Sequence, residues 1–206
     1  MFCPLCDCQK HFNVIWENQK VCLVFDNYGL HYGHLLFIPK KHVLNLSFVY
    51  SEVSSFLPEI IRQMQAFFET EIFVYEHGNV SENQTLNYSI DHAHLHVLPV
   101  LQSTKSIIDT LTKETTFEKI KFSDFYEQKQ KYPYHLLTIN GVEAIFTFAK
   151  LKSEAFREAY AICEGVEFWD WKISGETIKK CNRQYYEDKL LLKRFMIKEM
   201  EKIGFK

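Results

Sequence analysis

The spacing of apolar and polar residues predicts that the first hundred residues form a sheet. Residues 21–25 are a short apolar run closed by turn residues at 26–29, and residues 33–39 contain a second run ended by Pro39. Apolar runs of this length, bounded by turn residues, are typical of buried strands. We therefore expect two antiparallel strands here and a third over residues 72–76.

An amphipathic helix is predicted between these strands, over residues 51–71. Apolar side chains recur there every three or four residues, which places them on one helix face. Ser51, Ser54 or Ser55 could cap its start, and Pro58 would then fall in or near the first turn, where its missing N–H does least harm. Such a helix should cover one face of the sheet.

The second half of the chain has a different pattern. Residues 102–133 are polar and weakly periodic, which predicts a connecting segment with one or two short helices. Residues 135–146 hold an Asn-Gly pair between two apolar runs, the sequence signal of a tight β-hairpin. Ser153 could cap a helix that runs to about residue 164, and a final helix is expected over residues 175–203.

Composition and charge describe an ordinary globular protein. The chain has 206 residues, 47% of them hydrophobic, and a formal net charge of −2. This charge gives no reason to expect bulk binding of nucleic acid or of an anionic membrane. No apolar run approaches the ~18 residues that span a bilayer, and the first residues lack the features of a signal peptide, so we expect a cytosolic protein.

Six cysteines in a cytosolic chain indicate reduced thiols or metal ligands rather than disulfides. Cys3 and Cys6 have the Cys-x-x-Cys spacing of half a zinc site, which needs two further nitrogen or sulfur ligands. Ordinary thiols and redox chemistry are the alternatives. The redox interpretation would need a following helix to lower a thiol pKa, and the polar residues that follow are poor helix formers.

The main chemical signal is the stretch of residues 91–99, Asp-His-Ala-His-Leu-His-Val-Leu-Pro. In a strand, His92, His94 and His96 would share one face, and the other face would be apolar. Alternate Cα atoms lie about 6.6 Å apart, so neighbouring histidines could hold one metal ion or one phosphate, whereas His92 and His96 could hardly share an ion. Catalysis is favoured over a pure metal site or solvated histidines.

The first hundred residues resemble a histidine triad (HIT) protein. The resemblance rests on Cys3-x-x-Cys6, Asp26, the Gly-His-Leu-Leu-Phe-Ile-Pro-Lys-Lys-His stretch over residues 33–42, and the triad His92-x-His94-x-His96. It implies an α+β fold: a HIT-like antiparallel sheet with a covering helix, followed by a C-terminal α+β extension.

The expected domains are a HIT-like catalytic domain over residues 1–105 and an extension of a hairpin plus helices over residues 106–206. Residues 153–157 and the aromatic patch at 168–171 resemble, more weakly, a longer bacterial HIT subgroup. Family members often dimerise, so a homodimer is also expected.

The resemblance implies a nucleotidyl hydrolase or transferase that acts at the α-phosphate of a nucleotide conjugate or dinucleoside polyphosphate. His94 would attack the phosphorus and form a covalent nucleotidyl-histidine, which suits an imidazole with an ordinary pKa of about 6.5. His96 would contact the phosphate and help protonate the leaving group, and His34 would support the site. Alternatives are a zinc-stabilised nucleotide-binding module with little turnover and a protein–protein adaptor.

The resemblance also implies ligands for the substrate and for a structural Zn²⁺ ion. Asp26 would bind the ribose hydroxyls, unless it is simply a turn residue, and Ser89 would contact the phosphate. The implied zinc ligands are Cys3, Cys6, His42 and His92, with Cys8 as a substitute for one thiolate.

Two motifs depart from the family pattern. Residues 87–91 replace its usual Gly-Gln, and Glu76-His77-Gly78 replaces its Asn-x-Gly. Both departures concern the orientation of the substrate rather than the nucleophile.

Overall fold

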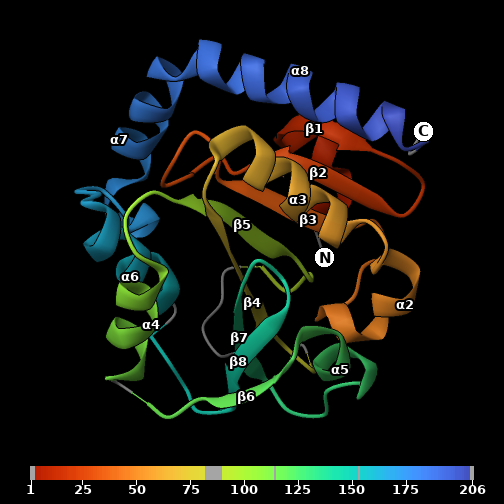
Figure 1. Cartoon of the computed structure of the whole chain (residues 1–206), viewed down its shortest axis with the longest axis vertical. Helices are drawn as coiled ribbons and strands as arrows, with labels where there is room; N and C mark the ends of the chain where they lie inside the picture. Colours follow the sequence, from red (N-terminus) through yellow and green to blue (C-terminus); the bar gives the residue numbers. More distant parts are fainter. Residues whose placement is uncertain (1–2, 82–89, 114, 153, 205–206) are drawn as a thin grey trace.

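One antiparallel sheet runs through both halves of the chain (Figure 1). The computed structural model describes residues 3–81, 90–113, 115–152 and 154–204. In these ranges the fold is α+β, and its eight strands follow the order β1-β2-β3-β5-β4-β7-β8-β6. The strands are β1 (Asn13–Glu17), β2 (Val21–Phe25), β3 (Leu35–Pro39), β4 (Glu71–Gly78), β5 (Leu95–Val100), β6 (Glu118–Lys121), β7 (Tyr134–Ile139) and β8 (Glu143–Thr147).

Helices cover both faces of this sheet. The longer ones are α3 (Leu57–Phe68), α4 (Thr104–Thr112), α6 (Ala155–Glu164), α7 (Trp171–Gln184) and α8 (Tyr186–Lys202). The shorter ones are η1 (Pro4–Asp7), α1 (Cys8–His11), η2 (Leu46–Phe48), α2 (Tyr50–Val53) and α5 (Phe122–Glu127).

Alternating strand residues divide the core between the two faces. On one face, residues such as Leu23, Phe37 and Leu95 pack with α3, α5 and α8. On the other face, Phe73 and Leu98 of the central strands pack with α4 and α6. The part of that second face formed by β2 and β3 is covered by the N-terminal turn instead. Two separate covers therefore lie on the second face, the N-terminal turn and the helices α4 and α6.

The predicted strands β2, β3 and β4 and the predicted hairpin are confirmed. The hairpin is formed by β7 and β8, and Asn140 and Gly141 at its turn have φ angles of 59° and 71°. Two consecutive positive φ angles belong to the tight turn that matches strand twist, which explains the Asn-Gly signal. The two short helices expected in residues 102–133 are α4 and α5.

Other boundaries differ from the prediction. The single helix expected over residues 51–71 is two helices, α2 and α3, and none of the three serines caps α3. Pro58 lies in the first turn of α3, and because proline has no N–H it cannot continue a helix from the residues before it. The final helix divides at Tyr185 into α7 and α8. Ser153, the expected cap of α6, lies outside the described residues.

Two strands were not predicted. Strand β1 has an irregular register between Val14 and Trp16, which breaks the alternation that the sequence pattern relies on. Strand β6 is a mostly exposed edge strand in a polar segment. Edge strands carry little hydrophobic signal because neither face needs to be buried.

The two expected domains share this sheet. Strand β4 of the first part pairs with β7 of the second along six residues, from Phe73 opposite Ile139 to Gly78 opposite Tyr134. The division at residue 105 stays a prediction about folding units. No helix in the described ranges is both long and apolar enough to cross a membrane.

A buried carboxyl group joins four elements near this junction. Glu76 of β4 is fully buried and accepts hydrogen bonds from the hydroxyls of Tyr126 and Tyr134 and from the backbone N–H of Leu46. Burial disfavours the ionised form and raises the pKa of Glu76 from 4.5 to about 7, although all three donors act in the opposite direction.

We expect the contribution of Glu76 to the free energy of unfolding to fall as the pH rises. Because the pKa of Glu76 is higher in the folded state, its contribution to stability falls between about pH 4.5 and pH 7 and is constant above that range. Urea unfolding should show the stability of the wild type relative to Glu76→Gln falling by up to about 3 kcal/mol between pH 5 and pH 8. Glu71→Gln, at the exposed start of the same strand, is the control, and an equal change there would contradict this account.

Candidate functional site

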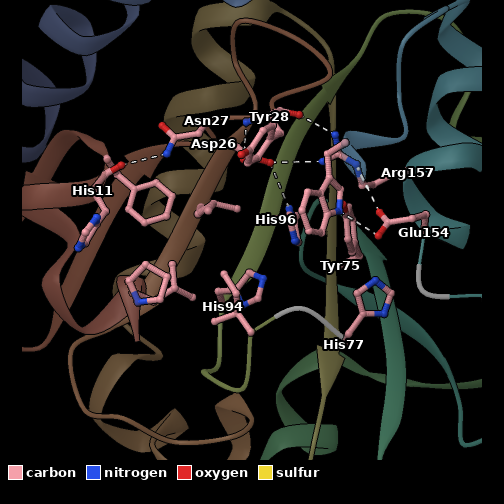
Figure 2. Close-up of a pocket in the computed structure, with 16 residues that line it drawn as sticks. His11, Asp26, Asn27, Tyr28, Tyr75, His77, His94, His96, Glu154 and Arg157 are labelled. Atoms are coloured by element: carbon pink, nitrogen blue, oxygen red, sulfur yellow. Dashed lines mark hydrogen bonds and ion pairs between the residues drawn. The ribbon is translucent and has the colours of Figure 1, made fainter. Parts of the chain in front are cut away.

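A cavity of about 390 Å³ lies on the second face of the sheet, between the N-terminal turn and α6 (Figure 2). Its volume is within the range of small-molecule sites. The strands contribute Leu36, Tyr75, His77 and His96 to its lining. The lining residues are Pro4, Leu5, His11, Phe12, Asp26, Asn27, Tyr28, Leu36, Tyr75, His77, Ile90, His94, His96, Glu154, Arg157 and Trp171.

The ring of His94 lies in the middle of this lining (Figure 2). Its Nδ1 atom is 2.7 Å from the backbone carbonyl oxygen of His92. A carbonyl oxygen can only accept, so the hydrogen-bond network assigns the proton of His94 to Nδ1. The Nε2 atom of His94 therefore keeps its lone pair for a ligand in the cavity.

His34 and His96 form a directed pair beside it. The backbone N–H of Leu30 donates to Nδ1 of His34 at 3.2 Å, so His34 carries its proton on Nε2. That atom is 2.9 Å from Nδ1 of His96, which must then accept. His96 consequently carries its own proton on Nε2. The Nε2 atom of His94 thus offers a lone pair, and the Nε2 atom of His96 offers an N–H donor.

Burial keeps these rings neutral. It lowers the pKa of His34 to about 3 and holds the pKa of His96 well below its ordinary value, an effect to which neighbouring histidines add. Burial also lowers the pKa of His94, despite the opposing effect of its hydrogen bond to His92. Neutral imidazoles near pH 7 are what the tautomers assigned above require.

Asp26 is buried beside this pair and shares one oxygen among several partners. Its Oδ2 atom is 3.4 Å from Nη1 of Arg157, 3.5 Å from Nε2 of His34 and 4.0 Å from Nδ1 of His96, and Oδ1 accepts from the backbone N–H of Tyr28. Burial acts to raise the pKa of Asp26, but His34, Arg157 and Tyr28 together lower it. Asp26 can therefore be both the turn residue and a residue of the site.

Asp26, His34 and His96 also have ligand atoms within 4.8 Å of one another, as a metal site requires. The guanidinium of Arg157 lies against the same carboxylate oxygen and would repel a cation there. The hydrogen-bonded arrangement explains these three side chains without a metal.

The second cluster consists of Cys3, Cys6, His42 and His92, whose ligand atoms all lie within 4.8 Å of one another. The Sγ atom of Cys3 is 3.3 Å from Nδ1 of His92, and Sγ of Cys6 is 3.1 Å from Nδ1 of His42 and 3.5 Å from Nδ1 of His92. Tetrahedral zinc, with bonds of about 2.3 Å to sulfur and about 2.0–2.1 Å to nitrogen, would separate such atoms by roughly 3.6 Å. The cluster therefore fits a metal ion.

The chemistry of the donors agrees with that fit. Nε2 of His92 donates to the carbonyl oxygen of Pro39 at 2.8 Å, which leaves Nδ1 as the ligand atom. Burial and the Cys3 thiol raise the pKa of Cys6 to about 11, so the Cys6 thiolate that a metal requires would be stabilised by the cation itself. Cys8 is not part of the cluster, because its thiol is buried and donates to the carbonyl oxygen of Leu5 at 3.0 Å.

The prediction that the three triad histidines share one strand face is wrong. Strand β5 begins at Leu95, and His92 and His94 lie before it in an irregular segment. The N–H of Ala93 donates to the carbonyl oxygen of Val43 at 2.6 Å, outside the sheet ladder. This departure turns His92 toward the cysteines while His94 stays at the cavity.

The structure brings together most of the other residues that the sequence singled out, and it adds new ones. His34, His94, His96 and Asp26 lie at the cavity, whereas Ser89 lies outside the described residues.

The additions are Glu154, Arg157, Trp171 and His77. Nδ1 of His77 is 2.7 Å from Nδ1 of His135 on β7. The sequence pointed to residues 153–157 only as a weak resemblance to a longer HIT subgroup, and nothing in that amphipathic helix marks Arg157 as a residue of the site.

The first half of the chain is similar to proteins of a known family. Residues 8–102 match the family model described as the HIT domain. An uncharacterized HIT-like protein of Saccharolobus solfataricus is 22% identical over 136 residues, which cover 64% of this chain and 92% of that protein.

Solved structures of HIT proteins are also similar. A hypothetical histidine triad nucleotide-binding protein of Sulfolobus tokodaii is 21% identical, with a TM-score of 0.39, and the match covers 47% of this chain and 68% of that one. A zinc-bound histidine triad family protein of Mycobacterium smegmatis is 19% identical, with a TM-score of 0.38. The match covers 47% of this chain and 73% of that protein.

We expect the Cys/His cluster to hold one metal ion per chain. Cys6→Ser should lose that ion and lower the melting temperature, because a structural metal contributes directly to folding stability. Native mass spectrometry and elemental analysis would measure the metal content. Cys8→Ser, a matched change outside the cluster, should keep the ion, and equal loss from both variants would show that the ligand set is wrong.

Proposed function

We propose that this chain, which belongs to the histidine triad (HIT) superfamily through residues 8–102, is a nucleotidyl hydrolase or transferase. Its substrate is a nucleotide conjugate or dinucleoside polyphosphate, cleaved at the α-phosphate. The observation that carries the proposal is the hydrogen bond from Nδ1 of His94 to the His92 carbonyl, which leaves a neutral Nε2 lone pair at the cavity.

In the first step, Nε2 of His94 forms a bond to the α-phosphorus as the bond to the leaving group breaks. The electron pair of that bond goes to the leaving atom, which takes the proton from Nε2 of His96. The negative charge left on the hydrogen-bonded pair of His96 and His34 offsets the positive charge that the His94 ring gains. His34 supports this transfer through its 2.9 Å contact with the other nitrogen of His96. The product of the step is a covalent nucleotidyl-histidine on His94.

In the second step, water or another acceptor attacks the same phosphorus. The acceptor gives its proton to Nε2 of His96, and the phosphorus–nitrogen bond breaks so that the pair returns to His94. Two easier displacements thus replace one difficult displacement. The nature of the acceptor decides between a hydrolase, a phosphorylase and a transferase.

The two sides of the cavity favour one orientation of the nucleotide. Leu5, Phe12 and Leu36 make an apolar side that suits a flat base. Asp26 would accept from the ribose hydroxyls, because a carboxylate has more acceptor positions than its present partners use. Ser89 stays a predicted phosphate contact.

We also propose that the metal of the Cys/His cluster is a structural Zn²⁺ ion held by Cys3, Cys6, His42 and His92. Two thiolates and two imidazoles are a set that zinc prefers, and four protein ligands leave no open position for a substrate. Its contribution would be to fix the N-terminal turn and the segment before β5. A homodimer, a cytosolic location and separate folding of residues 1–105 stay predictions.

The proposal predicts a nucleotidyl adduct on His94. Rapid acid-free quenching of the protein with a panel of nucleotide conjugates, followed by intact mass spectrometry, should show an increment of one mononucleotide that peptide mapping places on His94. His94→Asn should lose this adduct and lower turnover by at least about 10³-fold, since it removes the nucleophile.

The control for this experiment is His31→Asn, the same change at a histidine outside the cavity lining, which should still form the adduct. Turnover by a correctly folded His94→Asn variant would refute the mechanism. Nucleotide binding without adduct or turnover would favour the alternative, a zinc-stabilised binding module.

A further inference from the structure

The extension supplies three residues of the cavity lining, Glu154, Arg157 and Trp171. Figure 2 shows Arg157 and Glu154 on the side opposite His11 and Asn27, with His94 between the two sides. Arg157 and Glu154 belong to α6 and the residue before it, and Trp171 begins α7. If the base of the nucleotide occupies the apolar side, the group beyond the α-phosphate faces this second, polar side.

Arg157 is a buried cation that is held rigidly at that side. It is 5% exposed, its Nε atom donates to the carbonyl oxygen of Trp169 at 3.1 Å, and Nη2 donates to that of Tyr28 at 2.6 Å. Its Nη1 atom contacts Asp26. These three bonds use three of the five N–H groups of the guanidinium, one on each nitrogen. One N–H on each terminal nitrogen is not used by these three bonds, and the carboxylate of Glu154 forms a longer ion pair with Nε, at 3.6 Å.

A second polar side chain, that of Tyr75, lines the cavity together with Arg157. The hydroxyl of Tyr75 is fully buried and has no hydrogen-bond partner among the described residues. Tyr75 lines the cavity, and its ring stacks on His96 with centroids 4.3 Å apart. Arg157 lines the same cavity, and its charge and side-chain hydrogen-bonding groups oppose the rise in the pKa of Tyr75 that burial causes. A buried hydroxyl without a partner indicates that another polar atom belongs there.

We propose that Arg157 determines specificity by binding a phosphoryl oxygen of the leaving group, with the Tyr75 hydroxyl as a second donor. This inference rests on the proposed function and adds the substrate class, a conjugate with a second phosphate next to the α-phosphate. A planar guanidinium with paired N–H groups matches phosphate geometry, whereas an uncharged amine leaving group would leave these donors unpaired.

The pairing of Arg157 with Asp26 is compatible with this role. Asp26 takes one N–H and fixes the orientation of the guanidinium, so the remaining two are directed before the ligand arrives. Preorganised donors of this kind bind an anion without the cost of ordering a long side chain. The extension, rather than the HIT domain alone, would then select which conjugate is cleaved.

The test compares nucleoside diphosphates with the matching monophosphates. Isothermal titration of the full chain with ADP and AMP, GDP and GMP, and UDP and UMP should show the preferred diphosphate binding about 10- to 100-fold more tightly, the range expected for one or two charge-assisted hydrogen bonds. In the Arg157→Lys variant, the ratio of diphosphate affinity to monophosphate affinity should fall to about threefold or less. Lysine keeps the charge opposite Asp26 but loses the paired N–H groups.

Lys172→Gln is the control. Its ammonium lies 3.4 Å from Glu154 but is not part of the cavity lining, so the variant should keep the diphosphate preference. Thermal melting establishes that each variant is folded. Tyr75→Phe, which changes only the hydroxyl, should reduce the ratio by a smaller factor and serves as a second variant if Arg157→Lys does not fold.

Several outcomes would overturn the proposal. These are equal affinity of the wild type for diphosphate and monophosphate, an equal loss of both affinities in Arg157→Lys, an unchanged ratio in that variant, or loss of the ratio in Lys172→Gln. Because the readout is binding, it does not depend on turnover. A diphosphate preference that needs Arg157, without an adduct on His94, would support this inference and refute the proposed function.

Discussion

The hydrogen bond from the ring of His94 to the carbonyl oxygen of His92 is the constraint on which the site depends. It exists because residues 92–94 leave the regular strand, which frees that carbonyl from the sheet ladder. The same short segment places His92 among Cys3, Cys6 and His42. The backbone of residues 92–94 therefore couples the Cys/His cluster to the position of the His94 ring.

The second half of the chain is part of this arrangement rather than an addition beside it. Its hairpin extends the sheet across β4, and its helix α6 covers the face on which the cavity lies. Through Arg157, α6 reaches Asp26 and, by way of that carboxylate, the pair of His34 and His96. One buried ion pair thus connects the C-terminal helices to the histidines of the first half.

Local sequence patterns were sufficient to predict those parts of the structure that neighbouring residues determine. The buried strands, the Asn140-Gly141 turn and the clustering of Cys3 and Cys6 with two histidines follow from hydrophobic runs, turn chemistry or the family resemblance. Local patterns were not sufficient where contacts between residues far apart in the sequence determine the structure. The break before β5 depends on a bond to Val43, and the place of Arg157 depends on how α6 packs. Neither is visible from neighbouring residues alone.

The central claim is that His94 presents an unprotonated Nε2 atom to the cavity at neutral pH. Nitrogen-15 NMR of the histidine-labelled protein, with His94 assigned by comparison with His94→Asn, reports directly which ring nitrogen carries the proton. The account predicts a protonated Nδ1 and an unprotonated Nε2. A proton on Nε2, or an imidazolium near pH 7, would contradict it.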